Sequence, residues 1–527
     1  MKGDTLLANC RVLSMDEALP EAGAMVIRGG LVAFVGEAGA AGLFAGPEAI
    51  RIDLHGRTVI PGFNDNHLHA VILGDHALAP DLGGLDAPAI VDLLRERWAG
   101  APPGRILYAF NWDYPSCPWP RKELLDAAFP HNPVILSQFS GHGQWLNSAS
   151  LGVLGISRES GDPPMGEVLR DPDGEPTGIV RGLGDTGLSR KRFARIFYDR
   201  EQREARLDIA LAEFRRLGLT SVQDNTWFPQ SLASLARYRR DGRLTARFSC
   251  WPMGRRHWTL PAMRLAFAIG RATGLLPHDW VALGPAKYFL DGAFSSRSAS
   301  LFEPWADGTP GDRGPEPHTQ RLTLERLAWS GFRGTFHAIG DRAVASFLDD
   351  FTQVAGEYPH ITKQRFRIEH AQLVRRQDIA RIRELGLCVA AQPSALGSPG
   401  KDTRLLGSER ALGAYPYRSF LDAGVPLSFG SDIPGEATSD PLLHIHYAVN
   451  REGEQAITVL EALRCYTRGS AYAEFMEDRK GTLAPGMLAD FVVLSTDPLT
   501  APRPSLREIS VLETWVDGNC VYRREGT

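Results

Sequence analysis

The sequence predicts an α/β protein: a (β/α)8 TIM barrel with a composite β-sandwich formed by both termini and an inserted subdomain. Three observations support this fold class. Strand-like and helix-like segments alternate through the middle of the chain, short strands with tight turns fill both ends, and one long interval breaks the alternation. A doubly wound sheet is the competing α/β arrangement.

Both chain ends, residues 1–57 and 481–527, consist of short apolar runs separated by turn signals. Arg28-Gly29-Gly30 lies between two such runs and predicts a hairpin, and Asp517-Gly518 predicts a turn near the other end. Neither end buries enough apolar surface to be stable alone. We therefore expect the two ends to pair into one small β-sandwich, with two independent flaps as the alternative.

The span 58–480 alternates between strand and helix patterns, which predicts the barrel domain. Eight strands are expected, at 58–67, 220–224, 246–250, 286–290, 334–337, 366–370, 387–391 and 426–430. Helices are expected between them, at 201–217, 341–355, 375–386 and 456–468. The carboxyl ends of parallel barrel strands open on one face, and that face is where catalytic groups lie.

The interval 80–200 lacks a clean alternation, and Pro, Gly and Trp are frequent in it. Because it is too long for a loop, we expect a subdomain inserted after the first barrel strand, placed to cover the barrel mouth. Trp112, His142 and Trp145 lie in this interval and are candidate substrate contacts. Aromatic side chains of such a segment are more often part of its own core, and His142 is equally explained as the cap of a turn.

Six polar side chains lie on or just beyond five of the expected strands: His67, His69, Lys287, His337, His370 and Asp432. Residues two apart on a strand point to the same face, so His67 and His69 point together. Imidazole and carboxylate groups suit Zn²⁺ and related divalent ions. A bound metal lowers the pKa of its water to about 7, so the set predicts hydrolysis by a metal-bound hydroxide. Each histidine taken singly is equally explained as an ordinary core residue.

Lys287 is the unusual member of this set, because an ammonium group does not bind a metal. A buried lysine loses its charge readily, and its neutral amine can take up carbon dioxide as a carbamate. A carbamate has two anionic oxygens, which suit a bridge between two metals about 3.5–4 Å apart. The alternative is an ordinary ion pair between Lys287 and Asp291 or Glu303.

The ordered set resembles the amidohydrolase superfamily, and most closely its YtcJ-like (amidohydrolase 3) branch, which includes N-substituted formamide deformylases. The matching segments are PGFNDNH at 61–67, KYFLDG at 287–292, FHAIGD at 336–341, IEHAQ at 368–372, GSD at 430–432 and GTLAPGMLADF at 481–491. They occur in the family order and span nearly the whole chain. The resemblance implies the barrel, the composite sandwich and hydrolysis of C–N bonds.

The resemblance also implies a role for each residue of the set. Transferred position by position, His67 and His69 bind the more buried metal, His337 and His370 bind the second, carbamylated Lys287 bridges them, and Asp432 binds a metal. Asp432 is then the general base, which takes a proton from the bridging water and passes it to the leaving nitrogen. The resemblance implies two Zn²⁺ ions, with Mn²⁺ or Fe²⁺ and a one-metal site left open.

The expected enzyme is a hydrolase acting on C–N bonds other than peptide bonds, in an amide, formamide or cyclic amide. An ester or lactone hydrolase at the same metals is the first alternative. A mononuclear deaminase or isomerase is disfavoured by Lys287, and a non-catalytic scaffold is disfavoured because no ligand is missing. Arg297 is a further candidate substrate contact, with a salt bridge in its loop as the alternative.

The composition limits the partners and the compartment. The formal charge is 58 − 62 = −4, without a strong patch of one sign, which argues against nucleic acid or an acidic membrane surface. Six scattered cysteines with no CxxC pair favour a reducing, cytoplasmic setting. No run approaches the roughly 18 apolar residues of a membrane helix. We expect a small-molecule substrate, and a homodimer is left open.

Overall fold

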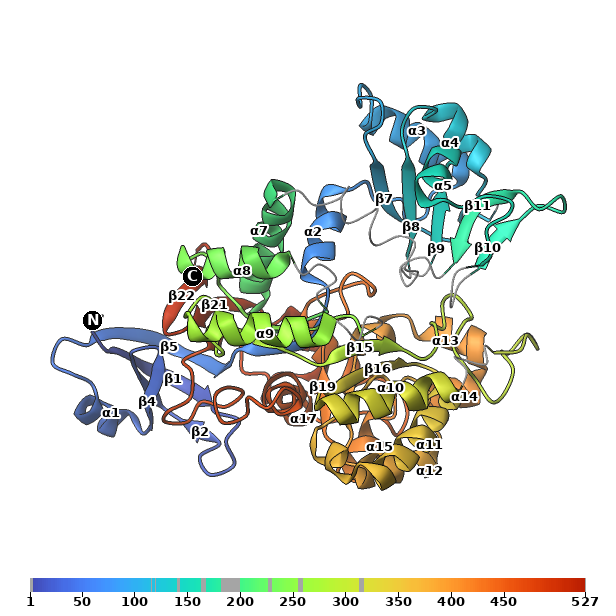
Figure 1. Cartoon of the computed structure of the whole chain (residues 1–527). Coiled ribbons are helices and arrows are strands. Elements are labelled where there is room, and N and C mark those ends of the chain that lie inside the picture. The colour runs from blue at the N-terminus through green and yellow to red at the C-terminus, as the bar shows by residue number, and fades with distance from the viewer. Residues whose placement is uncertain are drawn as a thin grey trace. The chain divides into compact units, whose positions relative to one another are not determined.

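The computed structural model describes residues 3–526 except for 115, 119, 140–142, 163–166, 182–199, 226–229, 255–258 and 312–316. The chain divides into two compact units (Figure 1). The first unit comprises Met1–Ala70 and Ala210–Thr527, and the second comprises Val71–Ile209. None of the described helices is both long enough and apolar enough to cross a membrane.

An eight-stranded sheet in the first unit is built from both chain ends, in the order β22-β21-β20-β5-β1-β3-β4, with β2 paired to β1. The strands are β1 (Thr5–Leu13), β2 (Glu21–Ala22), β3 (Ala24–Arg28), β4 (Leu31–Gly36), β5 (Ile50–Pro61), β20 (Phe491–Leu494), β21 (Val511–Val516) and β22 (Asn519–Arg523). Helix α1 (Ala38–Phe44) follows β4. The two ends meet where β5 pairs antiparallel with β20, and Val59 and Phe491 share the buried core there.

Two parallel sheets make up the rest of the first unit. One has the order β14-β13-β12-β6 and the other β15-β16-β17-β18-β19. Their strands are β6 (Phe63–Leu68), β12 (Leu219–Asp224), β13 (Arg247–Cys250), β14 (Val281–Leu283), β15 (Ala286–Phe289), β16 (Gly334–Ala338), β17 (Arg367–His370), β18 (Cys388–Ala391) and β19 (Leu427–Phe429). The expected strands of the middle of the chain therefore form, and the α/β class is confirmed.

Helices follow the parallel strands, as the alternation predicts. They are α7 (Arg200–Leu217), α8 (Ser231–Arg240), α9 (Thr259–Ala272), α10 (Pro317–Ser330), α11 (Asp341–Glu357), α12 (Arg376–Glu384), α13 (Pro399–Leu406), α14 (Ser408–Gly413), α15 (Tyr417–Asp422), α16 (Pro441–Asn450), α17 (Val459–Arg464) and α18 (Ser470–Ala473). Short 3-10 helices span Pro359–Lys363, Pro393–Gly397 and Arg503–Glu508, and a π-helical turn at Cys465–Gly469 joins α17 to α18.

The strand expected over 58–67 is split at Gly62. Residues up to Pro61 belong to the terminal sheet as β5, whereas β6 starts at Phe63 and pairs in parallel with β12. A Cβ at Gly62 would lie 2.1 Å from the Thr220 hydroxyl oxygen, so only glycine lets the chain pass so close to β12. An apolar run cannot reveal such a change of sheet, because both halves are buried.

The closed (β/α)8 barrel was expected, and the described residues do not show one continuous ring of paired strands. The two parallel sheets nevertheless approach each other at both margins. On one side, Met253 and Lys287 form an isolated parallel bridge. On the other, the Asp432 amide donates to the His67 carbonyl at 2.6 Å and the His69 amide donates to the Ile433 carbonyl at 2.9 Å.

The second unit contains a five-stranded sheet in the order β10-β11-β9-β8-β7. Its elements are α2 (Ala70–Leu78), α3 (Ala87–Arg97), β7 (Leu107–Trp112), α4 (Lys122–Ala128), β8 (Val134–Gln138), β9 (Gly143–Leu146), α5 (Ser148–Leu154), β10 (Glu167–Arg170) and β11 (Pro176–Arg181). Strands β7 and β8 pair in parallel, and the other pairs are antiparallel. Trp112 and Trp145 are fully buried in one apolar cluster of this unit.

Candidate metal centre

The six candidate residues all lie in the first unit, on or next to its parallel strands. His67 is near the end of β6 and His69 follows that strand, His370 is the last residue of β17, and Asp432 follows β19. Lys287 is in β15 and His337 in β16. Their strands come from both parallel sheets, so the site joins the two.

Three of these side chains approach one another closely enough to share one ion. Ligand atoms of His67, His370 and Asp432 all lie within 4.8 Å of one another. The Oδ1 atom of Asp432 is 3.4 Å from Nε2 of His67 and 3.3 Å from Nε2 of His69. The other carboxylate oxygen is 3.9 Å from Nδ1 of His370. A single carboxylate is therefore set among three imidazoles.

Lys287 belongs to the same cluster. Its side chain is 1% exposed, and its Nζ atom lies 3.5 Å from Nε2 of His67 and over the ring of Phe289. Asp291, the alternative partner considered from the sequence, accepts hydrogen bonds from the backbone amides of Ser300, Ile339 and Gly340. The lysine amine thus lies beside the candidate ligands, as the carbamate hypothesis requires.

His337 lies next to His370, with ring centroids 4.3 Å apart. Its Nε2 atom is 2.9 Å from the Gly292 carbonyl oxygen. An imidazole that donates from Nε2 to a carbonyl has Nδ1 as its acceptor nitrogen, which is the form that binds metals.

A hydrogen-bond acceptor at Nδ1 orients the ring of each of His67 and His370. Nδ1 of His67 is 2.5 Å from a Glu369 carboxylate oxygen, and Nδ1 of His370 is 2.8 Å from the amide oxygen of Gln392. In each ring the Nδ1–H donates to that oxygen, which leaves Nε2 as the acceptor. Histidines that ligate metals almost always have such a partner on their other nitrogen, because it fixes the tautomer and the ring orientation.

Glu369 is itself held in a buried network. Its carboxylate accepts hydrogen bonds from the Thr335 hydroxyl and from the Arg367 guanidinium. Arg367 also donates to Gln223 at 2.5 Å and to the Asn66 carbonyl at 2.8 Å. Sequence reasoning missed Glu369, Arg367 and Gln392. Arg367 and Glu369 are two apart on β17, and this pair of opposite charges on one strand face is a weak signal that does not by itself indicate a contact with His67.

Burial and neighbouring charge set the protonation of the cluster. Burial, reinforced by the positive charge of Lys287, holds the pKa of both His67 and His370 well below its usual range. Burial would raise the pKa of Asp432, but His67 and a hydrogen bond from His69 outweigh it and lower that pKa to about 2. Neutral imidazoles and an ionised carboxylate are the states in which these groups bind metals.

Two of the candidate residues have strained backbones. His370 has a φ of 74° and Asp432 a φ of 54°, in the left-handed region that residues other than glycine rarely adopt. Strain of this kind persists where the surrounding structure enforces it, and it is concentrated at functional sites.

Comparison with known proteins identifies the family of this chain. The model of the family described as "Amidohydrolase family" matches residues 51–522. The chain belongs to the amidohydrolase family. This confirms the family that the ordered motifs indicate.

Three relatives match this amidohydrolase over nearly its full length. Protein LONG AFTER FAR-RED 3 of Arabidopsis thaliana is 31% identical, covering 98% of this chain and 91% of the relative. Putative amidohydrolase YtcJ of Bacillus subtilis is 30% identical, covering 91% and 92%. N-substituted formamide deformylase of Arthrobacter pascens is 28% identical, covering 99% of both.

A solved structure resembles the amidohydrolase in fold as well as in sequence. The crystal structure of an uncharacterized metal-dependent hydrolase from Pyrococcus furiosus is 29% identical, with a TM-score of 0.73. The match covers 94% of this chain and all of that one.

The structure gives other partners to three of the four predicted substrate contacts, and the fourth lies outside the described residues. In the amidohydrolase, Trp112 and Trp145 are core residues of the second unit, and the Trp112 indole donates to the Leu136 carbonyl at 2.8 Å. Arg297 pairs with Asp307 on an exposed loop. His142 lies outside the described residues. A role of these four in substrate binding remains a prediction.

Proposed function

We propose that this amidohydrolase is a metal-dependent hydrolase that cleaves a C–N bond other than a peptide bond in a small amide, formamide or cyclic amide. One observation carries the proposal: ligand atoms of His67, His370 and Asp432 lie within 4.8 Å of one another, while both histidines are oriented through Nδ1 by buried acceptors. The deformylase named above, which aligns over 99% of this chain, supports the bond type.

The donor set fits a divalent cation. It consists of imidazoles and a carboxylate, a combination that suits Zn²⁺ and, less selectively, Mn²⁺ or Fe²⁺. Two ions would be held by His67, His69, His337, His370, Asp432 and the carbamate of Lys287. The carbamate forms when the neutral Nζ adds to the carbon of carbon dioxide and releases a proton. Lys287 is 1% exposed and its Nζ atom lies 3.5 Å from Nε2 of His67, so a carbamate formed there would lie beside the candidate ligands.

A cation bound there supplies Lewis acidity and lowers the pKa of water to about 7. Asp432 is the proposed general base, because its carboxylate is ionised, is surrounded by the candidate ligands and is 18% exposed. It takes a proton from the attacking water as the water oxygen bonds to the carbonyl carbon. It then returns the proton to the leaving nitrogen as the C–N bond breaks.

The proposed site requires both parallel sheets, and we assign them to one (β/α)8 barrel. The Met253–Lys287 bridge at one margin and the backbone hydrogen bonds of His67 and His69 at the other support this closure. In such a barrel the carboxyl ends of all strands open on one face. The six residues then converge on that face although they are far apart in sequence.

Metal analysis of the purified protein tests the bridged site first. We expect two metal equivalents per chain in the wild type and fewer in Lys287→Ala. Arg326→Ala, which removes a cationic side chain elsewhere in the first unit, is the control and should retain the wild-type content. One equivalent that Lys287→Ala does not change would overturn the bridging role, and no metal in protein never exposed to a chelator would overturn the metal-dependent reaction.

A substrate panel then tests the bond type. Formanilides, N-acyl amino acids, cyclic amides and lactones are incubated with the metal-loaded protein, and the products are identified by mass. We expect turnover of at least one C–N substrate. Hydrolysis of lactones alone would assign the site to C–O bonds, and release of ammonia without an acyl product would assign it to deamination.

A further inference from the structure

The second unit contains a pocket that the proposed reaction does not use. Its volume is about 690 Å³, within the range of roughly 300–1,000 Å³ typical of small-molecule sites. It is lined by Leu78–Pro80, Arg97–Ala101, Gly104–Tyr108 and Arg206. None of the six metal-centre residues is among them.

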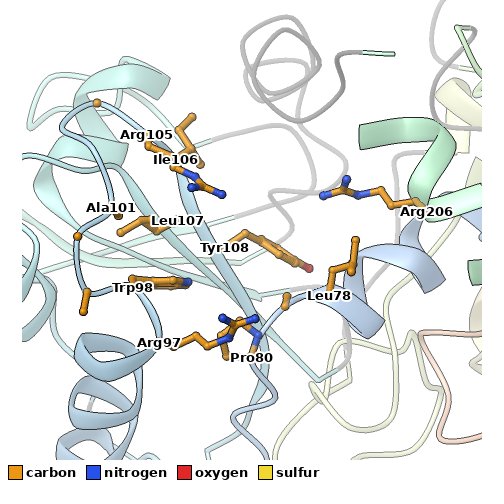
Figure 2. A pocket seen from close by; sticks show the side chains of 14 residues that line it. Leu78, Pro80, Arg97, Trp98, Ala101, Arg105, Ile106, Leu107, Tyr108 and Arg206 are labelled. Atoms are coloured by element: carbon orange, nitrogen blue, oxygen red, sulfur yellow. The ribbon is translucent and has the colours of Figure 1, made fainter. Parts of the chain in front are cut away.

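Three arginines give this pocket a strong positive charge. Figure 2 shows the side chains of Arg97, Arg105 and Arg206 directed into the same space from helix α3, from the loop before β7 and from helix α7. No acidic residue is among the described residues that line the pocket. Arg97 and Arg105 form no ion pair with any described carboxylate. The guanidinium forks of Arg97 and Arg105 are therefore suited to phosphate and carboxylate oxygens.

The backbone that carries these arginines is held in place by the fold. Helix α3 ends at Arg97, and the Trp98 amide donates to the Leu94 carbonyl at 2.9 Å. The Asn132 side chain donates to the carbonyls of Pro102 and Arg105, at 2.8 and 2.9 Å, and so fixes the loop between α3 and β7. The pocket thus has preformed walls, which lowers the entropy cost of binding.

Arg206 is fixed by close packing between helices. A Cβ at Gly74 would lie 2.5 Å from the Arg206 Cα atom, so α2 approaches α7 more closely than any larger residue would allow. This contact sets the backbone position from which the Arg206 side chain enters the pocket (Figure 2).

Aromatic groups line the same pocket. Trp98 is half-buried and packs edge-on against Phe129, with ring centroids 5.3 Å apart. Tyr108, on β7, presents its hydroxyl to the pocket between the arginines (Figure 2). Leu78, Ile106 and Leu107 add apolar surface. A flat apolar group can pack on these side chains while an attached anion reaches the guanidinium groups.

We propose that this pocket binds a small organic anion whose phosphate or carboxylate group is attached to a flat apolar body. The three guanidinium groups recognise the oxyanion, and Trp98 and Tyr108 contact the flat part. The site is distinct from the metal centre and does not depend on the proposed reaction.

Calorimetric titration of the full-length, metal-loaded protein tests this site with three probes: phenyl phosphate, phthalate and inorganic phosphate. We expect one aromatic anion to bind with one site per chain and inorganic phosphate to bind at least about tenfold more weakly, because it buries no apolar surface. The tighter of phenyl phosphate and phthalate identifies the preferred oxyanion. Absence of millimolar binding by both aromatic probes overturns the proposal, and equal affinity for inorganic phosphate overturns the role of the aromatic side chains.

Variants locate the bound anion. Arg97→Gln and Arg105→Gln replace exposed side chains, so the fold is retained, and each should weaken the aromatic probe by about tenfold. Arg95→Gln, two residues earlier on α3, is the matched control, because Arg95 does not line the pocket and pairs with Asp92. Asp432→Asn should leave binding unchanged. Binding that is lost in Asp432→Asn, or that is equal in Arg97→Gln, Arg105→Gln and wild type, places the anion elsewhere and overturns the proposal.

Discussion

Glu369 accepts a hydrogen bond from Nδ1 of His67 at 2.5 Å, although the two residues are 302 positions apart in sequence. The contact joins β17 to β6 and therefore joins the two parallel sheets at the candidate metal centre. Glu369 is completely buried, and its charge is balanced by Arg367. The carboxylate thus fixes which nitrogen of His67 faces Lys287 and Asp432.

Substituting Glu369→Gln is expected to weaken metal binding by about 10- to 100-fold, because a neutral amide oxygen is a weaker acceptor than a carboxylate, so the His67 ring is held less firmly and is less basic. Competition with a fluorescent chelator measures this affinity. Glu325→Gln on α10 is the control, since Glu325 pairs with Arg321 away from the site.

Because Glu369→Gln also removes the partner of Arg367, Gln392→Ala provides a second measurement without a buried charge. It removes the acceptor of His370 and should weaken metal binding in the same direction. Wild-type metal affinity in both variants, with folding verified by circular dichroism, would contradict the orienting role of these two side chains.

Asp432→Asn is expected to reduce turnover by a factor of about 10² to 10⁴, the usual contribution of a general base. The variant should retain bound metal, because the histidines and Lys287 are unchanged. Steady-state kinetics and metal content are measured on the same preparation. Asp349→Asn, an exposed carboxylate on α11, serves as the control, and hydrolysis by Asp432→Asn at the wild-type rate would refute the assignment of the base.

The alternation of apolar runs predicted most parallel strands within a few residues, because β-branched and aromatic runs are buried on both faces whatever their neighbours. It could not predict that the run before His67 changes sheets at Gly62. That change depends on the approach to Thr220, a contact between residues distant in sequence. Nor could composition alone establish that Trp112 and Trp145 fill a core of their own.

The metal-centre residues could be predicted from the sequence because histidine, lysine and aspartate are rare together at strand ends. Their motifs also occur in the order typical of the family. The residues that orient these histidines, Glu369 and Gln392, could not be assigned from the sequence. Glutamate and glutamine occur in strands and loops for many other reasons. Only the three-dimensional structure shows that each lies beside a histidine. Arg297 is a residue for which the sequence suggested a role that the structure does not show. Its position after β15 suggested a substrate contact, whereas the structure pairs it with Asp307.

A buried ion pair links the terminal sheet to β13. Arg247 and Asp490 are 2% and 4% exposed, and their side chains are joined by two bonds of 2.5 and 2.8 Å. Asp490→Asn leaves the buried Arg247 charge with only its longer, 3.4 Å contact to Asp517, which costs up to about 3–5 kcal/mol of folding stability. The decrease in the midpoint temperature of thermal unfolding, relative to wild type, measures this loss of stability. Asp349→Asn breaks the largely exposed pair with Arg381 and should cost only about 0–1 kcal/mol, so similar shifts in the two variants would contradict the structural role of Asp490.

The buried, neutral side chain of His444 indicates that the folded protein loses stability in acid. It is completely buried on α16, where Nε2–H donates to the Thr438 carbonyl at 3.1 Å and Nδ1 accepts from the Tyr466 hydroxyl. Burial lowers its pKa from 6.5 to about 3. The unfolded chain therefore binds a proton that the folded chain excludes, so the contribution of His444 is complete above pH 6.5 and declines as the pH falls toward about 3.

Thermal unfolding of the wild type and His444→Gln between about pH 7 and pH 5 isolates this contribution from that of the carboxylates, which titrate equally in both proteins. We expect the wild type to be the more stable at pH 7 and its advantage to narrow as the pH falls, because glutamine has no proton to gain. A constant difference in His444→Gln would mean that His444 is protonated in the folded protein, or that its neutral form contributes nothing to the fold.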